Sequence, residues 1–139
     1  MQKCGLFLIL CGLSISNAFA CEDWVTHLGK NQAFQGVITY EPMPTRQDPV
    51  VSTFTFRPKN CTVVGRYEFI EPGNQHRKGQ FSLAQAKANE KLNVFWHDDY
   101  GFGQLKLQFN DNLSSFTGIW FDTEATRPEG EWTGHEIAK

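Results

Sequence analysis

Long apolar runs are scarce in this chain of 139 residues. The one substantial run, Leu6–Ile15, is about half of the roughly 20 residues that a membrane-spanning helix needs, and no second run follows it. Lys3 precedes the run, and small residues at Ala18 and Ala20 follow it at the two positions that a signal peptidase requires. We therefore expect residues 1–20 to be a signal peptide and residues 21–139 to form a single exported domain, periplasmic or extracellular, without a transmembrane span.

Cysteine is also scarce. Cys4 and Cys11 lie within the expected signal peptide, which leaves Cys21 and Cys61 in the exported domain. An even pair in an oxidising compartment predicts a disulfide, which would close a loop of about 40 residues and contribute roughly 4 kcal/mol by the chain-entropy model. The alternative is lipid attachment at Cys21, because this residue directly follows the cleavage position; Cys61 would then be an odd free thiol.

An excess of positive charge is missing. The 13 Lys and Arg residues face 15 Asp and Glu, a net charge of −2, and the basic residues are scattered along the chain. A protein that binds nucleic acid needs a concentrated basic surface to neutralise phosphates. The sequence therefore argues against a nucleic-acid partner.

Recognisable motifs of hydrolytic catalysis are missing as well. The sequence has no serine nucleophile elbow, no zinc-spaced histidine pair and no calcium loop. Its one local concentration of titratable groups is His97 with Asp98 and Asp99, which His135 could join across the sheet. Histidine beside a carboxylate can transfer protons or bind a metal, so a small envelope hydrolase or metal-dependent enzyme centred there is one hypothesis. We expect no cofactor and favour a protein that is not an enzyme.

What the sequence does contain is a repeated alternation of apolar and polar residues, separated by turn residues, which predicts an all-β fold. In Gly103–Asn110, for example, Leu105, Leu107 and Phe109 fall on one face of the strand. The predicted strands are Phe34–Tyr40, Val50–Arg57, Thr62–Ile70, Lys78–Ala86, Lys91–His97, Gly103–Asn110, Ser115–Asp122 and Gly130–Ile137.

Most connections are short enough for antiparallel hairpins, so the predicted topology is a meander. Eight strands in a meander lose their exposed edges only by closing, which predicts an up-and-down β-barrel; an open β-sandwich is the alternative. We also expect a short helical segment at Cys21–Gly29 and longer loops at Pro42–Pro49 and Glu71–Arg77.

Glycines accompany aromatic residues in the carboxy-terminal half. The segments Phe116–Trp120 and Trp132–Gly134 each combine an aromatic residue, a spacer and a glycine, and Gly65–Tyr67 is a fainter version. At a period of two, the ring and the glycine face the same side, so strands can pack closely where the glycine lies. Tightly curved barrels need this arrangement.

With the export signal and the size, these motifs resemble the small avidin-like and lipocalin-like barrels, the calycin group, over about Val63–Glu136. The same pattern occurs in exported bacterial proteins of unassigned role. The resemblance implies a barrel with a binding cavity and assigns no ligand residues.

We therefore expect an exported, non-enzymatic binding protein. Its partner would be a small apolar or glycan ligand in the barrel cavity, or an exported or envelope protein, such as a hydrolase or toxin to be inhibited, held by the loop rim. A structural component of the envelope is a third possibility, which lipidation of Cys21 would favour. The candidate ligand-binding residues are aromatic, because rings bring large apolar area at low entropic cost. They are Trp96, Tyr100, Trp120 and Trp132.

Overall fold

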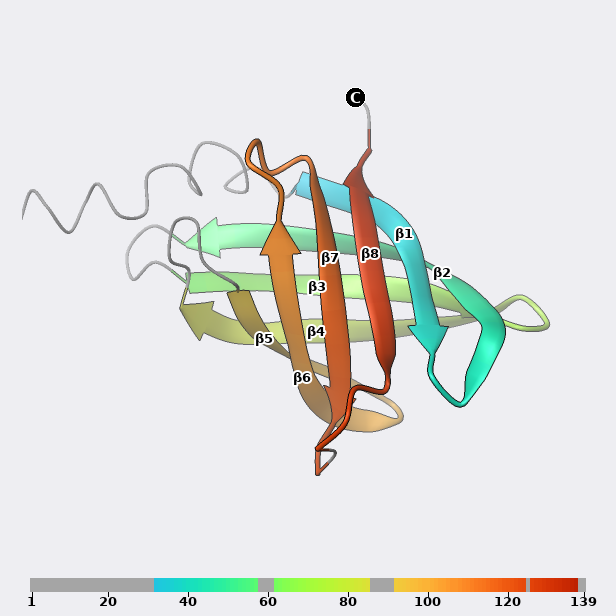
Figure 1. Ribbon diagram of the computed structural model, residues 1–139. Coiled ribbons are helices and arrows are strands. Elements are labelled where there is room, and N and C mark those ends of the chain that lie inside the picture. The colour runs from blue at the N-terminus through green and yellow to red at the C-terminus, as the bar shows by residue number, and fades with distance from the viewer. Residues whose placement is uncertain (1–31, 58–61, 86–91, 125, 138–139) are drawn as a thin grey trace, which may run out of the picture.

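The computed structural model describes residues 32–57, 62–85, 92–124 and 126–137, which form a closed antiparallel β-barrel (Figure 1). The predicted strand pattern is confirmed, with ends that differ by a few residues. The strands are β1 (Gln32–Tyr40), β2 (Met43–Arg57), β3 (Thr62–Glu71), β4 (Gln75–Gln85), β5 (Leu92–Asp98), β6 (Gly101–Phe109), β7 (Ser115–Asp122) and β8 (Gly130–Glu136).

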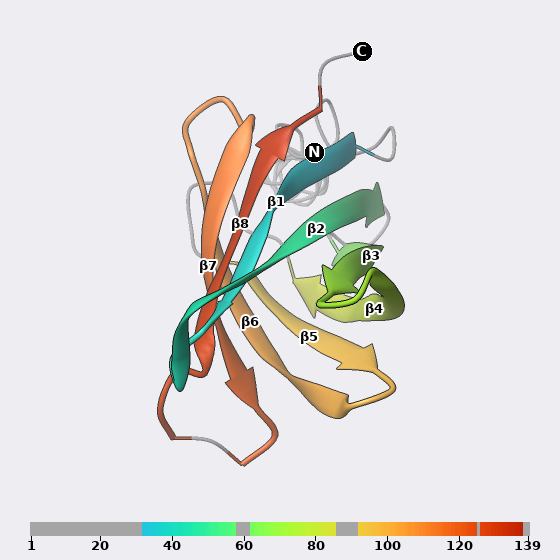
Figure 2. The same ribbon diagram turned by 90° about the vertical axis from the view of Figure 1, so that its right-hand side faces the viewer.

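Each strand pairs with the next strand in the sequence, and β8 returns to pair with β1. Figure 2 shows β8 and β1 side by side at this closure, where Phe34 lies opposite Glu136 and Ile38 opposite Trp132. The up-and-down barrel is thus confirmed and the open sandwich is excluded. Closure leaves no strand edge of the sheet unpaired, which removes the usual route to edge-to-edge aggregation.

The alternation that predicts the strands also sets the barrel interior. In β5, Leu92, Val94 and Trp96 are buried while Asn93 and Phe95 are exposed. The same alternation in the other strands fills the barrel with large apolar side chains. Because successive side chains of a strand point to opposite faces, a shift of one residue in any strand would turn its apolar residues outward, so burial fixes the register.

The prediction of two longer loops, at Pro42–Pro49 and Glu71–Arg77, is wrong. Strand β2 begins at Met43, and only a short turn separates it from β1. Between β3 and β4 the chain reverses through a tight turn in which Gly73 and Asn74 have positive φ angles of 83° and 59°. Proline and consecutive polar residues suggest a loop. Proline can nevertheless occupy an extended backbone where no ladder N–H is required, and the polar residues Arg46 and Asp48 have partners in the barrel.

Glycines and aromatic rings lie together in the barrel, as predicted. Each ring packs on a glycine of the neighbouring strand, however, and not on one of its own strand. Trp96 of β5 is paired in register with Gly103 of β6, where an added Cβ would lie 2.8 Å from the indole ring. The same close approach recurs between paired residues elsewhere: Tyr67 with Gly79, Phe81 with Gly65, Trp120 with Gly130, and Phe116 with Gly134. Each glycine thus leaves the space that a ring from the adjacent strand fills.

Several sequence predictions fall on residues outside the described ranges. These are the signal peptide, the helical segment at Cys21–Gly29, and the Cys21–Cys61 disulfide with its lipid alternative. Within the described ranges, no helix has the length and apolar character to cross a membrane.

Candidate binding pocket at one end of the barrel

The inward-facing side chains at the two ends of the barrel differ in chemical character. One end is formed by the β1–β2, β3–β4, β5–β6 and β7–β8 turns, and a hollow of about 270 Å³ opens there, which we call the mouth pocket. Polar side chains and aromatic rings line it together. The aromatic residues in its lining include Tyr40, Tyr67, Trp96, Tyr100, Trp120 and Trp132.

Trp96 and Trp120 form a corner of the mouth pocket. Their ring centroids lie 6.0 Å apart and their planes meet at 81°. Each indole N–H is engaged by the barrel wall, since Trp96 Nε1 donates to the Phe121 carbonyl and Trp120 Nε1 to the Thr39 carbonyl, both at 3.0 Å. These bonds hold the two rings at a fixed angle.

Trp132 and Tyr100 lie at different depths in the same pocket. Trp132 is 3% exposed and donates its indole N–H to the Ser52 hydroxyl at 3.1 Å, deep in the barrel. Tyr100 is 61% exposed and stands at the rim, in the β5–β6 turn. The structure therefore brings all four predicted ligand-binding residues to one pocket, with Trp132 at its base and Tyr100 at its opening.

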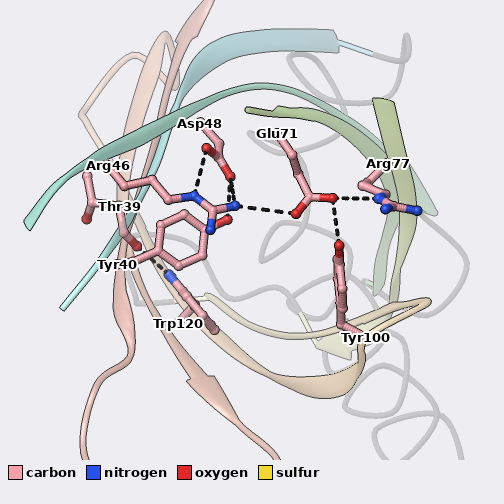
Figure 3. Close-up of polar contacts among 8 residues, drawn as sticks. All are labelled: Thr39, Tyr40, Arg46, Asp48, Glu71, Arg77, Tyr100 and Trp120. Carbon is pink, nitrogen blue, oxygen red and sulfur yellow. Dashed lines mark hydrogen bonds and ion pairs between the residues drawn. The ribbon is translucent and has the colours of Figure 1, made fainter. Parts of the chain in front are cut away.

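A buried carboxylate organises one side of the mouth pocket. Asp48 of β2 is 2% exposed and accepts hydrogen bonds from Arg46, at 2.9 and 3.2 Å, and from the Tyr40 hydroxyl at 2.7 Å (Figure 3). The Arg46 guanidinium also lies over the Tyr40 ring, 4.4 Å from its centroid. Burial, followed by the hydrogen bond to Asp48, raises the pKa of Tyr40, so its hydroxyl stays protonated and donates. The hydrogen bond to Asp48 raises the pKa of Arg46.

Glu71, at the end of β3, joins this group to the opposite rim. One of its oxygens accepts a bond from Arg46 at 3.3 Å, while the other accepts from Arg77 at 2.5 Å and from the Tyr100 hydroxyl at 2.6 Å (Figure 3). The hydrogen bond from Tyr100, followed by that from Arg77, lowers the pKa of the Glu71 carboxyl. The network thus connects β2, β3, β4 and the β5–β6 turn across the opening.

A second tyrosine–carboxylate pair lies on the β3 and β5 side. Tyr67, which is 3% exposed, donates its hydroxyl to Asp98 at 2.7 Å, and the backbone N–H of Tyr100 donates to the other Asp98 oxygen at 2.8 Å. Burial, followed by the hydrogen bond to Asp98, raises the pKa of Tyr67. Both oxygens of Asp98 are therefore held in position by donors, and each retains a lone pair that can accept another.

Two residues of the alternative enzyme hypothesis, His97 and Asp98, are on opposite faces of β5. His97 is exposed, as alternation along β5 requires, whereas Asp98 binds the inward-facing Tyr67. His97, Asp98, Asp99 and His135 nevertheless all border one broad hollow of about 1430 Å³, whose lining does not include Trp96 or Trp120. Asp98 lines the mouth pocket as well. Among the described residues no group of three His, Cys, Asp or Glu side chains could hold a metal ion.

Sequence reasoning missed the polar half of the mouth pocket. Tyr40, Arg46, Asp48 and Glu71 are not among the predicted site residues. Arg46 and Asp48 fall in the loop predicted at Pro42–Pro49 and Glu71 in that predicted at Glu71–Arg77. Alternation could have revealed Asp48, which continues the inward face of Val50, Ser52 and Phe54 at a period of two.

Taken together, the mouth pocket offers fixed aromatic faces and fixed polar groups in a partly enclosed space, which is the usual composition of a small-molecule binding site. Comparisons with known proteins do not assign this pocket to a family. No family model matches the chain, and neither the curated proteins nor the solved structures contain a significant match.

Proposed function

We propose that this protein is an exported, non-enzymatic binding protein of the calycin type, which takes a small ligand into the mouth pocket. The observation that carries the proposal is the hollow of about 270 Å³ at one end of a closed eight-stranded barrel, with Trp96, Trp120 and Trp132 in its lining. An eight-stranded barrel has an interior that side chains just fill or that holds one small ligand.

The fixed rings support this proposal. A wall that is already held at a set angle loses little conformational entropy when a ligand stacks against it, so more of the contact energy remains as affinity. The volume is slightly below the range typical of drug-sized ligands, which favours a compound of about one ring, with a short substituent. A sugar ring or a small apolar ring both fit this description.

A screen by thermal shift tests the proposal. The purified protein is heated with a panel of small ring compounds that includes monosaccharides, phenols and aromatic amines. A ligand at 100 times its dissociation constant stabilises the folded state by about 2.7 kcal/mol, which raises the melting temperature of a domain of this size by several degrees.

The tryptophan variants then locate the site. We expect Trp120→Phe to weaken binding of a hit compound about tenfold or more. This variant should lose less stability than Trp132→Phe, because Trp120 is only partly buried, although its N–H also has a partner, the Thr39 carbonyl. Trp132→Phe should lose stability first, since this residue is buried and its N–H bonds to Ser52. The matched control is Phe95→Ala, an aromatic residue that is 46% exposed outside the barrel, which should bind as the parent does.

Two results would contradict the proposal. One is that no compound raises the melting temperature while the protein binds an exported protein partner, which would move attention from the pocket to the outer surface. The other is that Trp120→Phe binds the hits as tightly as the parent while Phe95→Ala loses them.

A further inference from the structure

We infer that the ligand of the mouth pocket carries a positive charge and that it is a small ring compound bearing an ammonium group. This inference rests on the proposed function and specifies its ligand class. It follows from the charges around the pocket, from the faces of two tryptophans, and from their position relative to two aspartates.

The charges that face the pocket, or that are bonded to its lining, do not balance. Among the described residues of this region, the guanidinium groups of Arg46 and Arg77 face four carboxylates. Asp48 and Glu71 bind these two guanidinium groups directly. The two carboxylates that remain, Asp98 and Asp122, line the pocket, which therefore carries about two negative charges.

Asp98 and Asp122 have neutral partners. Asp98 accepts from the Tyr67 hydroxyl and a backbone N–H, and Asp122 accepts from the backbone N–H of Thr123 at 2.8 Å. These bonds position the carboxylates without neutralising their charge. Asp98 is half-buried and held at both oxygens, whereas Asp122 is exposed at the rim. An uncompensated carboxylate in a partly enclosed site attracts a cation more strongly than the same group does in open solvent, so Asp98 should contribute more than Asp122.

The strand register places these two carboxylates beside the tryptophan corner. Asp98 follows Trp96 by two residues on the same strand, and Asp122 is paired in register with Gly103, the residue on which the Trp96 ring packs. Trp120 stands almost perpendicular to Trp96. An ammonium group in this corner would meet two indole faces and two carboxylates, the combination that proteins use to bind organic cations.

The protein already binds cations in this way at the neighbouring tyrosines. Arg46 covers the Tyr40 ring at 4.4 Å and Arg77 lies over the Tyr100 ring at 5.5 Å. Within the described ranges, no lysine or arginine occupies Trp96 or Trp120 in the same manner, although indole is the stronger cation binder. Among the described residues, the two indoles of the tryptophan corner thus have no lysine or arginine over them, which leaves this role to the ligand.

Compounds of matched size test the inference. Benzylamine, which is an ammonium ion at pH 7, and benzyltrimethylammonium provide the cations; benzyl alcohol, methyl glucoside and benzoate provide two neutral compounds and an anion. Affinities are measured by isothermal titration at low and high salt. We expect both cations to bind at least tenfold more tightly than benzyl alcohol, benzoate to bind most weakly, and only the affinity of the cations to fall strongly with salt.

Asp122→Asn should weaken binding of the two cations about tenfold and leave that of benzyl alcohol unchanged. Asp98→Asn serves as a second variant, with an effect at least as large. Asp111→Asn makes the same chemical change in an exposed turn at the other end of the barrel and is the matched control. Melting curves show that each variant is folded.

The outcomes separate this inference from the proposed function. If benzyl alcohol, methyl glucoside or benzoate binds as tightly as the cations and Trp120→Phe weakens that binding, the pocket is a binding site and the inference of a cationic ligand is wrong. Cation binding that neither aspartate variant changes also overturns the inference. If none of the five compounds binds and the wider screen finds no ligand, the proposed function fails together with it.

Discussion

The two ends of this barrel are built from the same inward alternation and have opposite characters. At the end away from the mouth pocket, Phe34, Phe54, Phe109 and Phe116 pack against one another with ring centroids 5.4 to 6.0 Å apart. We call this group the phenylalanine end. At the mouth pocket, all the lining rings except Phe69 belong to tryptophan and tyrosine, and Arg46 and Glu71 lie among them.

The difference in ring chemistry between the two ends indicates that stability and recognition are served by separate parts of the barrel. Phenylalanine has no polar atom to satisfy, so it can fill an interior completely, and edge-to-face ring pairs add some stability beyond the area they bury. Tryptophan and tyrosine have a donor that needs a partner, and meeting that need fixes their rings beside polar groups. We expect the phenylalanine end to hold the barrel together and the mouth pocket to tolerate changes that alter binding.

The largest expected change in stability is that of Phe54→Ala, at the phenylalanine end. Phe54 is fully buried, and its ring stacks on Phe81 at 5.0 Å and contacts Phe34 and Phe116 edge-on. Removing such a ring leaves a cavity, so we expect a loss of about 3 to 5 kcal/mol in the free energy of unfolding. Urea denaturation measures this loss.

The control for Phe54→Ala is Phe102→Ala, since Phe102 is 54% exposed and its removal should change stability by no more than about 0.5 kcal/mol. A loss at Phe54 no larger than that at Phe102 would contradict the role of the phenylalanine end.

The strands could be predicted because each one alternates and is bounded by turn residues. Closure into a barrel also followed from the sequence, since a meander of eight strands has no other way to remove its edges. The start of β2 could not be predicted in the same way, because Arg46 and Asp48 look like loop residues until their partners across the barrel are known. Arg46 and Glu71 are 25 residues apart and meet only through the register of β2 and β3.

The candidate site, like the fold, could be predicted from the sequence only in part. The aromatic residues Trp96, Tyr100, Trp120 and Trp132 could be selected because large rings are conspicuous in any sequence, and the structure brings them together. That they bind a ligand is still a prediction. The residues that were missed are ordinary charged groups, whose importance lies in burial and pairing rather than in any motif.

A smaller effect is expected from Asp48→Asn, which tests whether the polar network of the mouth pocket also contributes to folding. Asp48 is buried and accepts charge-assisted bonds from Arg46 together with the Tyr40 hydroxyl. Asparagine keeps the shape and loses the charge, so we expect a loss of about 1.5 to 3 kcal/mol in the free energy of unfolding. Asp111→Asn is the control, and equal stability of the two variants would show that the network contributes nothing.

The smallest expected effect is the pH dependence of stability. The tyrosines whose pKa values are raised, and Glu71, whose pKa is lowered, lie at the mouth pocket. The pKa of Tyr67 is raised by burial and by its bond to Asp98, so the folded state keeps this proton when the unfolded chain, whose tyrosines titrate near 10.0, releases it. The stability that this group contributes is present below pH 10 and is lost as the pH rises above it. The pKa of Glu71 is lowered, mainly by the Tyr100 hydroxyl, so its contribution is present above the unfolded value of 4.5 and is lost as the pH falls through the folded value.

We therefore expect the melting temperature to be highest between about pH 5 and pH 9 and to decline on both sides. Each variant should flatten one side of this profile: Tyr67→Phe the decline above pH 10, and Glu71→Gln the decline below pH 4.5, because the variant side chain no longer exchanges the proton. Calorimetry at intervals of one pH unit measures both slopes, and Tyr100→Phe separates the hydrogen bond to Glu71 from its bonds to arginine. If either slope is the same in the variant as in the parent, that group does not couple proton binding to folding, and that side of the pH dependence arises from other titratable groups.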